Sequence, residues 1–141
     1  GFGSLHLEYS SSGAKKCVGY GLKFFWAQML MGDTADNIQG IKLLNGRLCG
    51  PAAAFDHLDP VDDESECANA VVDAYRAIGQ NPIPEGWLLW LLRREGDTFW
   101  IYLNELQWSP ANRRYLDECV QREWFKKVVT QPQEEFEDVQ F

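Results

Sequence analysis

The chain has 141 residues, of which 45% are hydrophobic and 24% charged, and its formal net charge is −8. This length and composition are typical of one globular domain with its own core. No apolar run reaches the roughly 20 residues that a membrane-spanning helix needs, and no signal-peptide pattern is visible. We therefore expect a cytoplasmic protein with no membrane partner.

The charge is unevenly distributed along the chain. Residues 1–50 carry a net charge of +2, and residues 51–141 carry −10. This asymmetry permits a local phosphate-binding face near the N-terminal end. The overall acidity, in contrast, is not typical of a basic nucleic-acid-binding domain.

Cysteine and histidine spacing gives little indication of a metal centre. The cysteines lack the C-x-x-C spacing of a zinc site, so we expect reduced, mostly buried thiols. His6 and His57 are isolated in the sequence and are expected to be structural or surface residues. The four cysteines are Cys17, Cys49, Cys67 and Cys119.

A β-hairpin is predicted over residues 4–20. Residues 5–9 alternate apolar and polar side chains, and residues 17–20 can return as a second strand after a small polar turn. Lys15 and Lys16 then lie near the tip of the hairpin. They are either solvated there or available to contact phosphate.

The clearest helix is predicted over residues 22–31, because apolar side chains recur there at helical spacing. It leads to Asp33 and Asp36, which would share one face if the helical register continued. Two carboxylates directed to one place suit Mg²⁺ or Mn²⁺. The alternative interpretation is that Asp33 caps a helix and Asp36 is a solvated turn residue.

The next stretch is predicted to be a loop over residues 40–50, with the pair Leu43-Leu44 anchoring it inward. A short helix over residues 50–58 follows, because Pro51 suits a first helical turn. Asp59-Pro60 ends that helix.

The second half of the chain is predicted to be helical. A helix is expected over residues 63–78, after an acidic run that favours a helix start. Residues 80–86 are a proline-containing linker, and residues 87–92 are a short buried helix. The type of the next segment, residues 98–106, stays open, with a hairpin across residues 95–97 as the rival to two helices. The core of this half of the chain is expected to include Trp87, Trp90, Phe99, Trp100 and Trp108.

A last helix is predicted over residues 109–129, with Ser109 as its N-cap and residues 131–141 as an acidic tail. The predicted fold class is thus mainly α (α+β), and the chain is expected to form a single domain over residues 1–141. The inner face of the last helix is expected to contain Tyr115, Leu116, Cys119, Val120, Trp124 and Phe125. The domain divides into a hairpin (1–20), the segment with the aspartate pair and the short helix (21–58), a helical subdomain (59–130) and the tail (131–141).

The stretch Gly-Asp-Thr-Ala-Asp-Asn-Ile-Gln-Gly-Ile over residues 32–41 resembles the Gly-Asp-x-x-Asp-Asn-Ile-Pro-Gly segment of the 5′-nuclease family. This family contains the bacteriophage 5′–3′ exonucleases and the flap endonucleases. The resemblance covers roughly residues 5–58. In the family, the two aspartates hold one of the catalytic metals, and the segment leads into a helix-hairpin-helix-like motif that grips duplex DNA.

The resemblance implies that the chain is the DNA-binding C-terminal part of a metal-dependent nuclease that hydrolyses DNA in phage replication or recombination. Asp33 and Asp36 would be catalytic ligands of Mg²⁺ or Mn²⁺, and a monovalent cation would sit in the hairpin. The partners would be DNA near a 5′ end or flap, an upstream nuclease domain and a phage polymerase. The DNA-binding residues would be Gly40, Lys42, Asn45, Gly46, Arg47, Gly50, Lys15 and Lys16.

The chain departs from the family pattern in its hairpin and in its acidic residues. A longer insert, residues 42–49, replaces the short Pro-Gly-x-Gly hairpin, and Ala52 and Ala53 stand where a lysine is common. Upstream of Asp33 the only acidic residue is Glu8, so we expect this chain alone to cleave poorly. The alternatives are a non-catalytic DNA-binding or replisome adaptor module and a tryptophan-rich protein-interaction domain.

Overall fold

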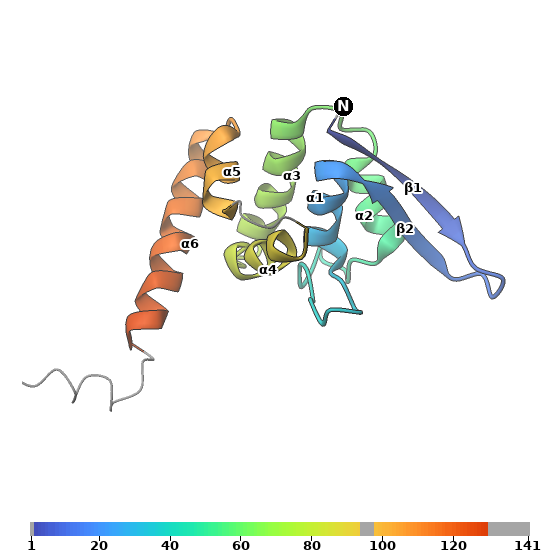
Figure 1. Cartoon of the computed structure of the whole chain (residues 1–141), viewed down its shortest axis with the longest axis horizontal. Coiled ribbons are helices and arrows are strands. Elements are labelled where there is room, and N and C mark those ends of the chain that lie inside the picture. Colours follow the sequence, from blue (N-terminus) through green and yellow to red (C-terminus); the bar gives the residue numbers. More distant parts are fainter. Residues whose placement is uncertain (1, 94–97, 130–141) are drawn as a thin grey trace, which may run out of the picture.

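The computed structural model describes residues 2–93 and 98–129. Over these ranges the chain folds as predicted into an α+β structure with a helical majority. Its elements are β1 (Gly3–Tyr9), β2 (Lys15–Tyr20), α1 (Gly21–Met31), α2 (Pro51–Leu58), α3 (Glu64–Ala77), α4 (Ile83–Arg93), α5 (Phe99–Glu105) and α6 (Pro110–Val129). The hairpin and α6 lie at opposite ends of the molecule, with α1 and α3 between them (Figure 1).

The hairpin packs one face against the helices. Its strands are antiparallel, with Leu7 paired to Cys17 and Glu8 paired to Lys16. Because side chains alternate along a strand, Leu5, Leu7 and Cys17 share one face. Leu5 and Cys17 are buried on that face, which leaves Lys16 on the other face of β2.

Helix α1 is the centre of the core. It contacts the hairpin, α2, α3 and α4, so its apolar stripe is enclosed from several sides. The hydroxyl of Tyr75 on α3 donates a hydrogen bond to the Met29 carbonyl oxygen. Lys23 is also buried, and its Nζ donates to the Asp59 carbonyl oxygen at 2.8 Å. The buried apolar residues of α1 are Phe25, Trp26, Ala27, Met29 and Leu30.

An aromatic cluster joins α1 to the second half of the chain. The ring of Phe25 lies 5.5 Å from that of Trp90 and 5.9 Å from that of Phe99, measured between centroids. Trp90 and Phe99 are buried, as predicted, whereas Trp87, Trp100 and Trp108 are only half-buried. The tryptophan-rich half therefore contributes most of its large side chains to the core or to the periphery of the core.

A polar network attaches α6 to α3. Asn112 is fully buried, and its Nδ2 donates to Asn69 Oδ1 at 2.9 Å and to Asp73 Oδ1 at 2.8 Å. Its Oδ1 accepts from Arg76 Nε at 3.0 Å. The predicted N-cap is confirmed, because Ser109 Oγ accepts from the Asn112 N–H at 3.2 Å.

Three predictions about the second half are wrong. Helix α4 begins at Ile83, so the expected linker over 80–86 is partly helical. That helix is not fully buried, because Leu88, Leu91 and Leu92 are at least half exposed. Trp124, expected on the inner face of α6, is 67% exposed.

Other expectations are decided or lie outside the described residues. Residues 98–106, whose secondary structure the sequence leaves open, contain the short helix α5, so the alternative of a strand in this segment is wrong. The bend at 95–97, the tail at 131–141 and the side chain of Phe125 lie outside what the structure describes. Within the described ranges, no helix combines the length and apolar character that crossing a membrane requires.

The cysteines are free thiols, as predicted. Cys17, Cys67 and Cys119 are buried, and Cys49 is half-buried. Burial raises the pKa of Cys49 to about 11 and that of Cys67 to about 12. These thiols therefore stay protonated at neutral pH and act as small apolar side chains.

Candidate metal and nucleic-acid site

The aspartate pair stands on a tight turn that begins where α1 ends. Gly32 ends the helix with a φ of 76°, and its N–H donates to the Gln28 carbonyl oxygen at 2.7 Å. A Cβ at this position would overlap the backbone of Ile38 and Gln39. Glycine is therefore required here by both backbone conformation and space.

The turn itself is closed by a pair of backbone hydrogen bonds. The N–H of Asp33 donates to the Ile38 carbonyl oxygen, and the N–H of Ile38 donates to that of Asp33, both at 2.8 Å. Asn37 takes a left-handed conformation with a φ of 58°, which asparagine tolerates better than most residues. Buried Ile38 and Ile41 hold the turn against the core.

This geometry corrects the expectation that the two carboxylates would meet on one face of a helix. Asp33 and Asp36 are not on a helix, but the turn folds them back toward each other. The Asp36 N–H donates to Asp33 Oδ1 at 3.4 Å, which is the long hydrogen bond of an Asx-type turn. The alternative interpretation was therefore right that Asp36 is an exposed turn residue.

The two carboxylates interact. A hydrogen bond to the Asp33 side chain raises the pKa of Asp36, and desolvation and the negative charge of Asp33 act in the same direction. The negative charge of Asp33 therefore disfavours the charged form of Asp36. A divalent cation between them would remove that repulsion, so the donor chemistry of this pair fits Mg²⁺ or Mn²⁺.

A cavity of about 260 Å³ brings Asp33, but not Asp36, together with residues that are distant in sequence. It contains Asp33 from the turn, Lys16 from β2 and Pro51 from the first turn of α2. Sequence reasoning placed Lys16 on a hairpin tip without placing it beside an aspartate. It also missed the α1 residues of this cavity, although their helical spacing marks a second face; they are Phe24, Gln28 and Met31.

Among the DNA-binding candidates, Gly40 is enclosed by the fold. Its N–H donates to Glu85 Oε2 at 3.3 Å, and its carbonyl oxygen accepts from Gln80 Nε2 at 3.0 Å. Its φ is +79°, and a Cβ would lie 2.5 Å from the Gly32 nitrogen. In this structure Gly40 serves the close approach of two backbone segments.

The predicted loop ends in a tight turn that projects basic and polar groups. Leu44 and Arg47 exchange backbone hydrogen bonds of 2.7 and 3.1 Å across Asn45 and Gly46. Both central residues have positive φ, the conformation of a type I′ turn. Leu44 is buried as an anchor, whereas Leu43, also expected inward, is 40% exposed.

The exposed part of this turn faces α2 across a shallow hollow of about 550 Å³. Asn45 and Arg47 line it from the turn, and His57 lines it from α2. His57 was expected to be only a structural or surface residue, and nothing in its isolated sequence position indicated this neighbourhood. The hollow is therefore lined by two basic side chains, Arg47 and His57, and by one carboxylate, that of Asp56.

The remaining candidates are dispersed around these two surfaces. Lys15 is exposed at the start of β2. Lys42 is exposed, and its N–H donates to Gln80 Oε1 at 2.7 Å. Gly50 is the exposed N-cap of α2 and supplies no side-chain hydrogen bond. Pro51 has no N–H, and the Ala54 N–H donates to the Gly50 carbonyl oxygen, so the first turn offers an anion only the N–H groups of Ala52 and Ala53.

Comparisons with protein-family models, with curated proteins and with solved structures find no match for this chain. Within residues 2–93 and 98–129, no group of three or more histidine, cysteine, aspartate or glutamate side chains is arranged to hold a metal. The aspartate pair thus offers two carboxylates at most, and a metal held there would take its further ligands from substrate phosphate, water or another polypeptide.

Proposed function

We propose that this chain is the DNA-binding portion of a metal-dependent 5′–3′ exonuclease or flap endonuclease. The observation that carries the proposal is the turn that brings Asp33 and Asp36 into contact, with Asp33 lining the same cavity as Lys16. Paired carboxylates are suited to a metal ion, and a lysine in the cavity that one of them lines is suited to the phosphate that the ion binds.

The loop and α2 support the same proposal with a second set of groups. Arg47 and Asn45 are exposed on a tight turn, and the first turn of α2 offers the backbone N–H groups of Ala52 and Ala53. Such groups bind DNA through its phosphates without reading its sequence. The local basic character of residues 1–50 is therefore the relevant charge, and not the net charge of the whole chain.

In this proposal the residues have separate roles. Asp33 and Asp36 would hold Mg²⁺ or Mn²⁺, which when bound supplies positive charge that offsets charge developing on the phosphate oxygens. Lys16 would contact the phosphate in the shared cavity, and Arg47 would contact the duplex backbone farther along. With only two carboxylates available, the chain by itself is expected to bind DNA and to cleave it poorly.

A non-catalytic DNA-binding adaptor is the second candidate. It is favoured by the lack of a three-ligand metal group in the parts of the chain that the structure describes. In that case Asp33 and Asp36 would be dispensable for every activity, whereas the basic surface would still bind DNA.

The test is a binding and cleavage assay on a fluorescently labelled 5′-flap DNA. We expect binding that weakens as salt rises, and Lys15→Ala/Lys16→Ala should lower the slope of log affinity against log salt by about two. The matched control is Arg122→Ala, which removes an exposed charge from α6. Binding that is independent of salt, or an equal loss in the control, would contradict the proposed surface.

A further inference from the structure

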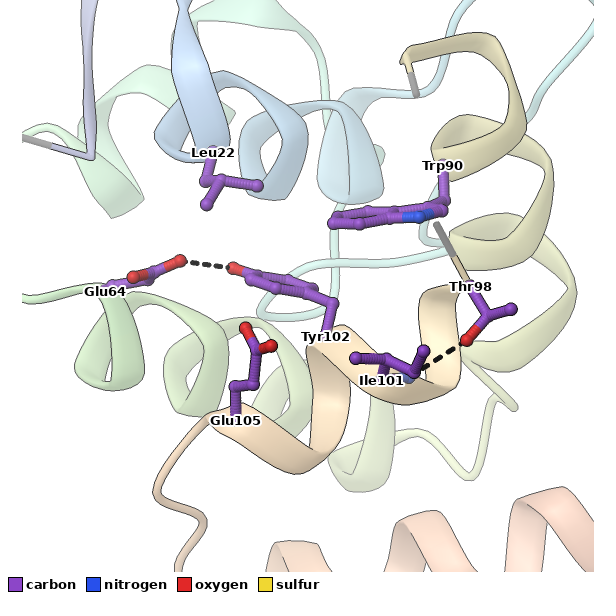
Figure 2. Close-up of a pocket in the computed structure, with 7 residues that line it drawn as sticks. All are labelled: Leu22, Glu64, Trp90, Thr98, Ile101, Tyr102 and Glu105. Carbon is purple, nitrogen blue, oxygen red and sulfur yellow. Dashed lines mark hydrogen bonds between the residues drawn. The ribbon is translucent and has the colours of Figure 1, made fainter. Parts of the chain in front are cut away.

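A second cavity, of about 280 Å³, opens between the start of α1 and helices α3, α4 and α5. Figure 2 shows the side chains that line it. It shares no lining residue with either surface of the proposed DNA-binding region. Its volume lies just below the range of about 300–1,000 Å³ that is usual for drug-sized ligands, so it suits a smaller group.

The cavity is negatively charged. Two carboxylates line it, Glu64 from the start of α3 and Glu105 from the end of α5, and among the residues that the structure describes no lysine, arginine or histidine lines it. Within the described residues, neither glutamate forms a salt bridge. An anionic ligand would be repelled here, and a cation would be attracted.

One of these carboxylates is held in place by a chain of hydrogen bonds that starts in the core. The buried Trp26 Nε1–H donates to the Tyr102 hydroxyl oxygen at 3.0 Å. The Tyr102 hydroxyl in turn donates to Glu64 Oε1 at 2.9 Å, as the dashed line in Figure 2 shows. Burial raises the pKa of Tyr102, so the hydroxyl remains a donor at all physiological pH values. Glu64 is thus oriented before any ligand arrives.

The other walls are aromatic and apolar. The rings of Trp90 and Tyr102 are stacked, with centroids 4.6 Å apart and planes inclined by 19°. Leu22 and Ile101 also line the cavity, and Ile101 is 58% exposed. Aromatic faces attract cations, and exposed apolar side chains favour the burial of an alkyl chain.

We propose that this cavity binds an organic cation, namely a guanidinium or a protonated amine carried on a short alkyl chain. The charged group would lie between Glu64 and Glu105, and the alkyl chain would lie against the aromatic wall. This chemistry is offered by a small free amine and also by an arginine side chain of a partner protein. The inference does not depend on the proposed nuclease function.

The experiment is a titration of the whole chain, followed by NMR through the tryptophan indole N–H signals. Three probes are compared: agmatine, N-acetyl-arginine methylamide and the neutral isostere N-acetyl-citrulline methylamide. We expect saturable shifts of the Trp90 signal, assigned with Trp90→Phe, for the two cationic probes only. Tighter binding of agmatine would indicate a free amine, and tighter binding of the blocked arginine would indicate a side chain.

Two substitutions locate the binding. Glu64→Gln keeps an acceptor for the Tyr102 hydroxyl and should weaken binding about tenfold, because it removes a charge-assisted contact. Glu105 is exposed, so Glu105→Gln should weaken binding about threefold. Glu66→Gln on α3 is the matched control and should change nothing. The proposal is overturned if no probe saturates, if the citrulline probe binds equally well, or if the control weakens binding as much as Glu64→Gln.

Discussion

Several residues of the segment over residues 32–41 are explained by packing alone. Gly32 and Gly40 let two backbone segments approach more closely than any side chain would allow, and Ile38 and Ile41 are buried. Asp36 is different, because it is exposed and its carboxylate raises the electrostatic energy of the turn. A residue that the fold does not need is the better candidate for a functional role.

The Asp33–Asp36 pair gives a prediction about stability and pH. The pKa of Asp36 is raised in the folded state, so the folded protein favours the protonated carboxyl. Its contribution is favourable at low pH and is lost as the pH rises through that pKa. In chelator, Asp36→Asn should therefore melt at a slightly higher temperature than the wild type at pH 7. The difference should shrink as the pH falls through the pKa of Asp36.

A pH series of thermal melts checks this prediction, with Asp117→Asn on α6 as the control for the loss of an exposed carboxylate. Added Mg²⁺ should remove the advantage of Asp36→Asn, because the ion stabilises only the paired carboxylates. A variant that is less stable than the wild type at pH 7 in chelator would show that the pair does not repel.

At the scale of elements, the start of α4 shows why a proline-rich stretch was mistaken for a linker. Asn81 Oδ1 accepts from the Ile83 N–H at 2.9 Å, which is an Asx turn that leads into the helix. Pro84 then falls in the first turn, where no N–H is needed. An asparagine followed by two prolines is thus equally compatible with a loop and with a helix start.

Gly86 on α4 gives a prediction in which two effects oppose each other. Alanine in a helix is favoured over glycine by about 0.5–1 kcal/mol. A Cβ at this position would, however, collide with the ring of Phe99, which is buried among Phe25, Trp90 and Trp100. Overpacking a core costs about 1–3 kcal/mol, so Gly86→Ala should be destabilising by about 1–2 kcal/mol.

Urea denaturation measures this effect, and a double-mutant cycle identifies its cause. If the ring of Phe99 is the obstacle, Gly86→Ala should cost less in a Phe99→Leu background than in the wild type. A gain of stability in the single variant would mean that the ring moves freely and that helix propensity decides.

At the scale of the whole molecule, the sequence predicted what is local. Apolar periodicity located α1 and α3, because helices are stabilised by neighbours three and four residues apart, and the Ser109 cap located the start of α6. The sequence did not predict that Lys16 would share a cavity with Asp33 or that Glu64 would share one with Glu105. Those encounters depend on how the hairpin and α5 pack, which no local pattern encodes.

The charge asymmetry is also a property of the whole chain. The N-terminal third contains the aspartate turn and the exposed turn with Arg47, while the acidic residues are concentrated in the helical remainder. Under the proposed function, a DNA duplex would be attracted to the N-terminal third and repelled by the acidic remainder.

Paramagnetic Mn²⁺ tests directly whether Asp33 and Asp36 together hold a divalent metal, as proposed. In a ¹⁵N-labelled sample, Mn²⁺ should broaden the amide signals of residues 33–37 first, and excess Mg²⁺ should restore them. Asp36→Asn should raise the Mn²⁺ concentration needed for this broadening at least tenfold, since even an indirect change at a metal ligand costs about 10–100-fold in affinity. Asp117→Asn/Glu118→Gln should leave it unchanged. Broadening that begins elsewhere, or that persists unchanged in Asp36→Asn, would contradict the metal site.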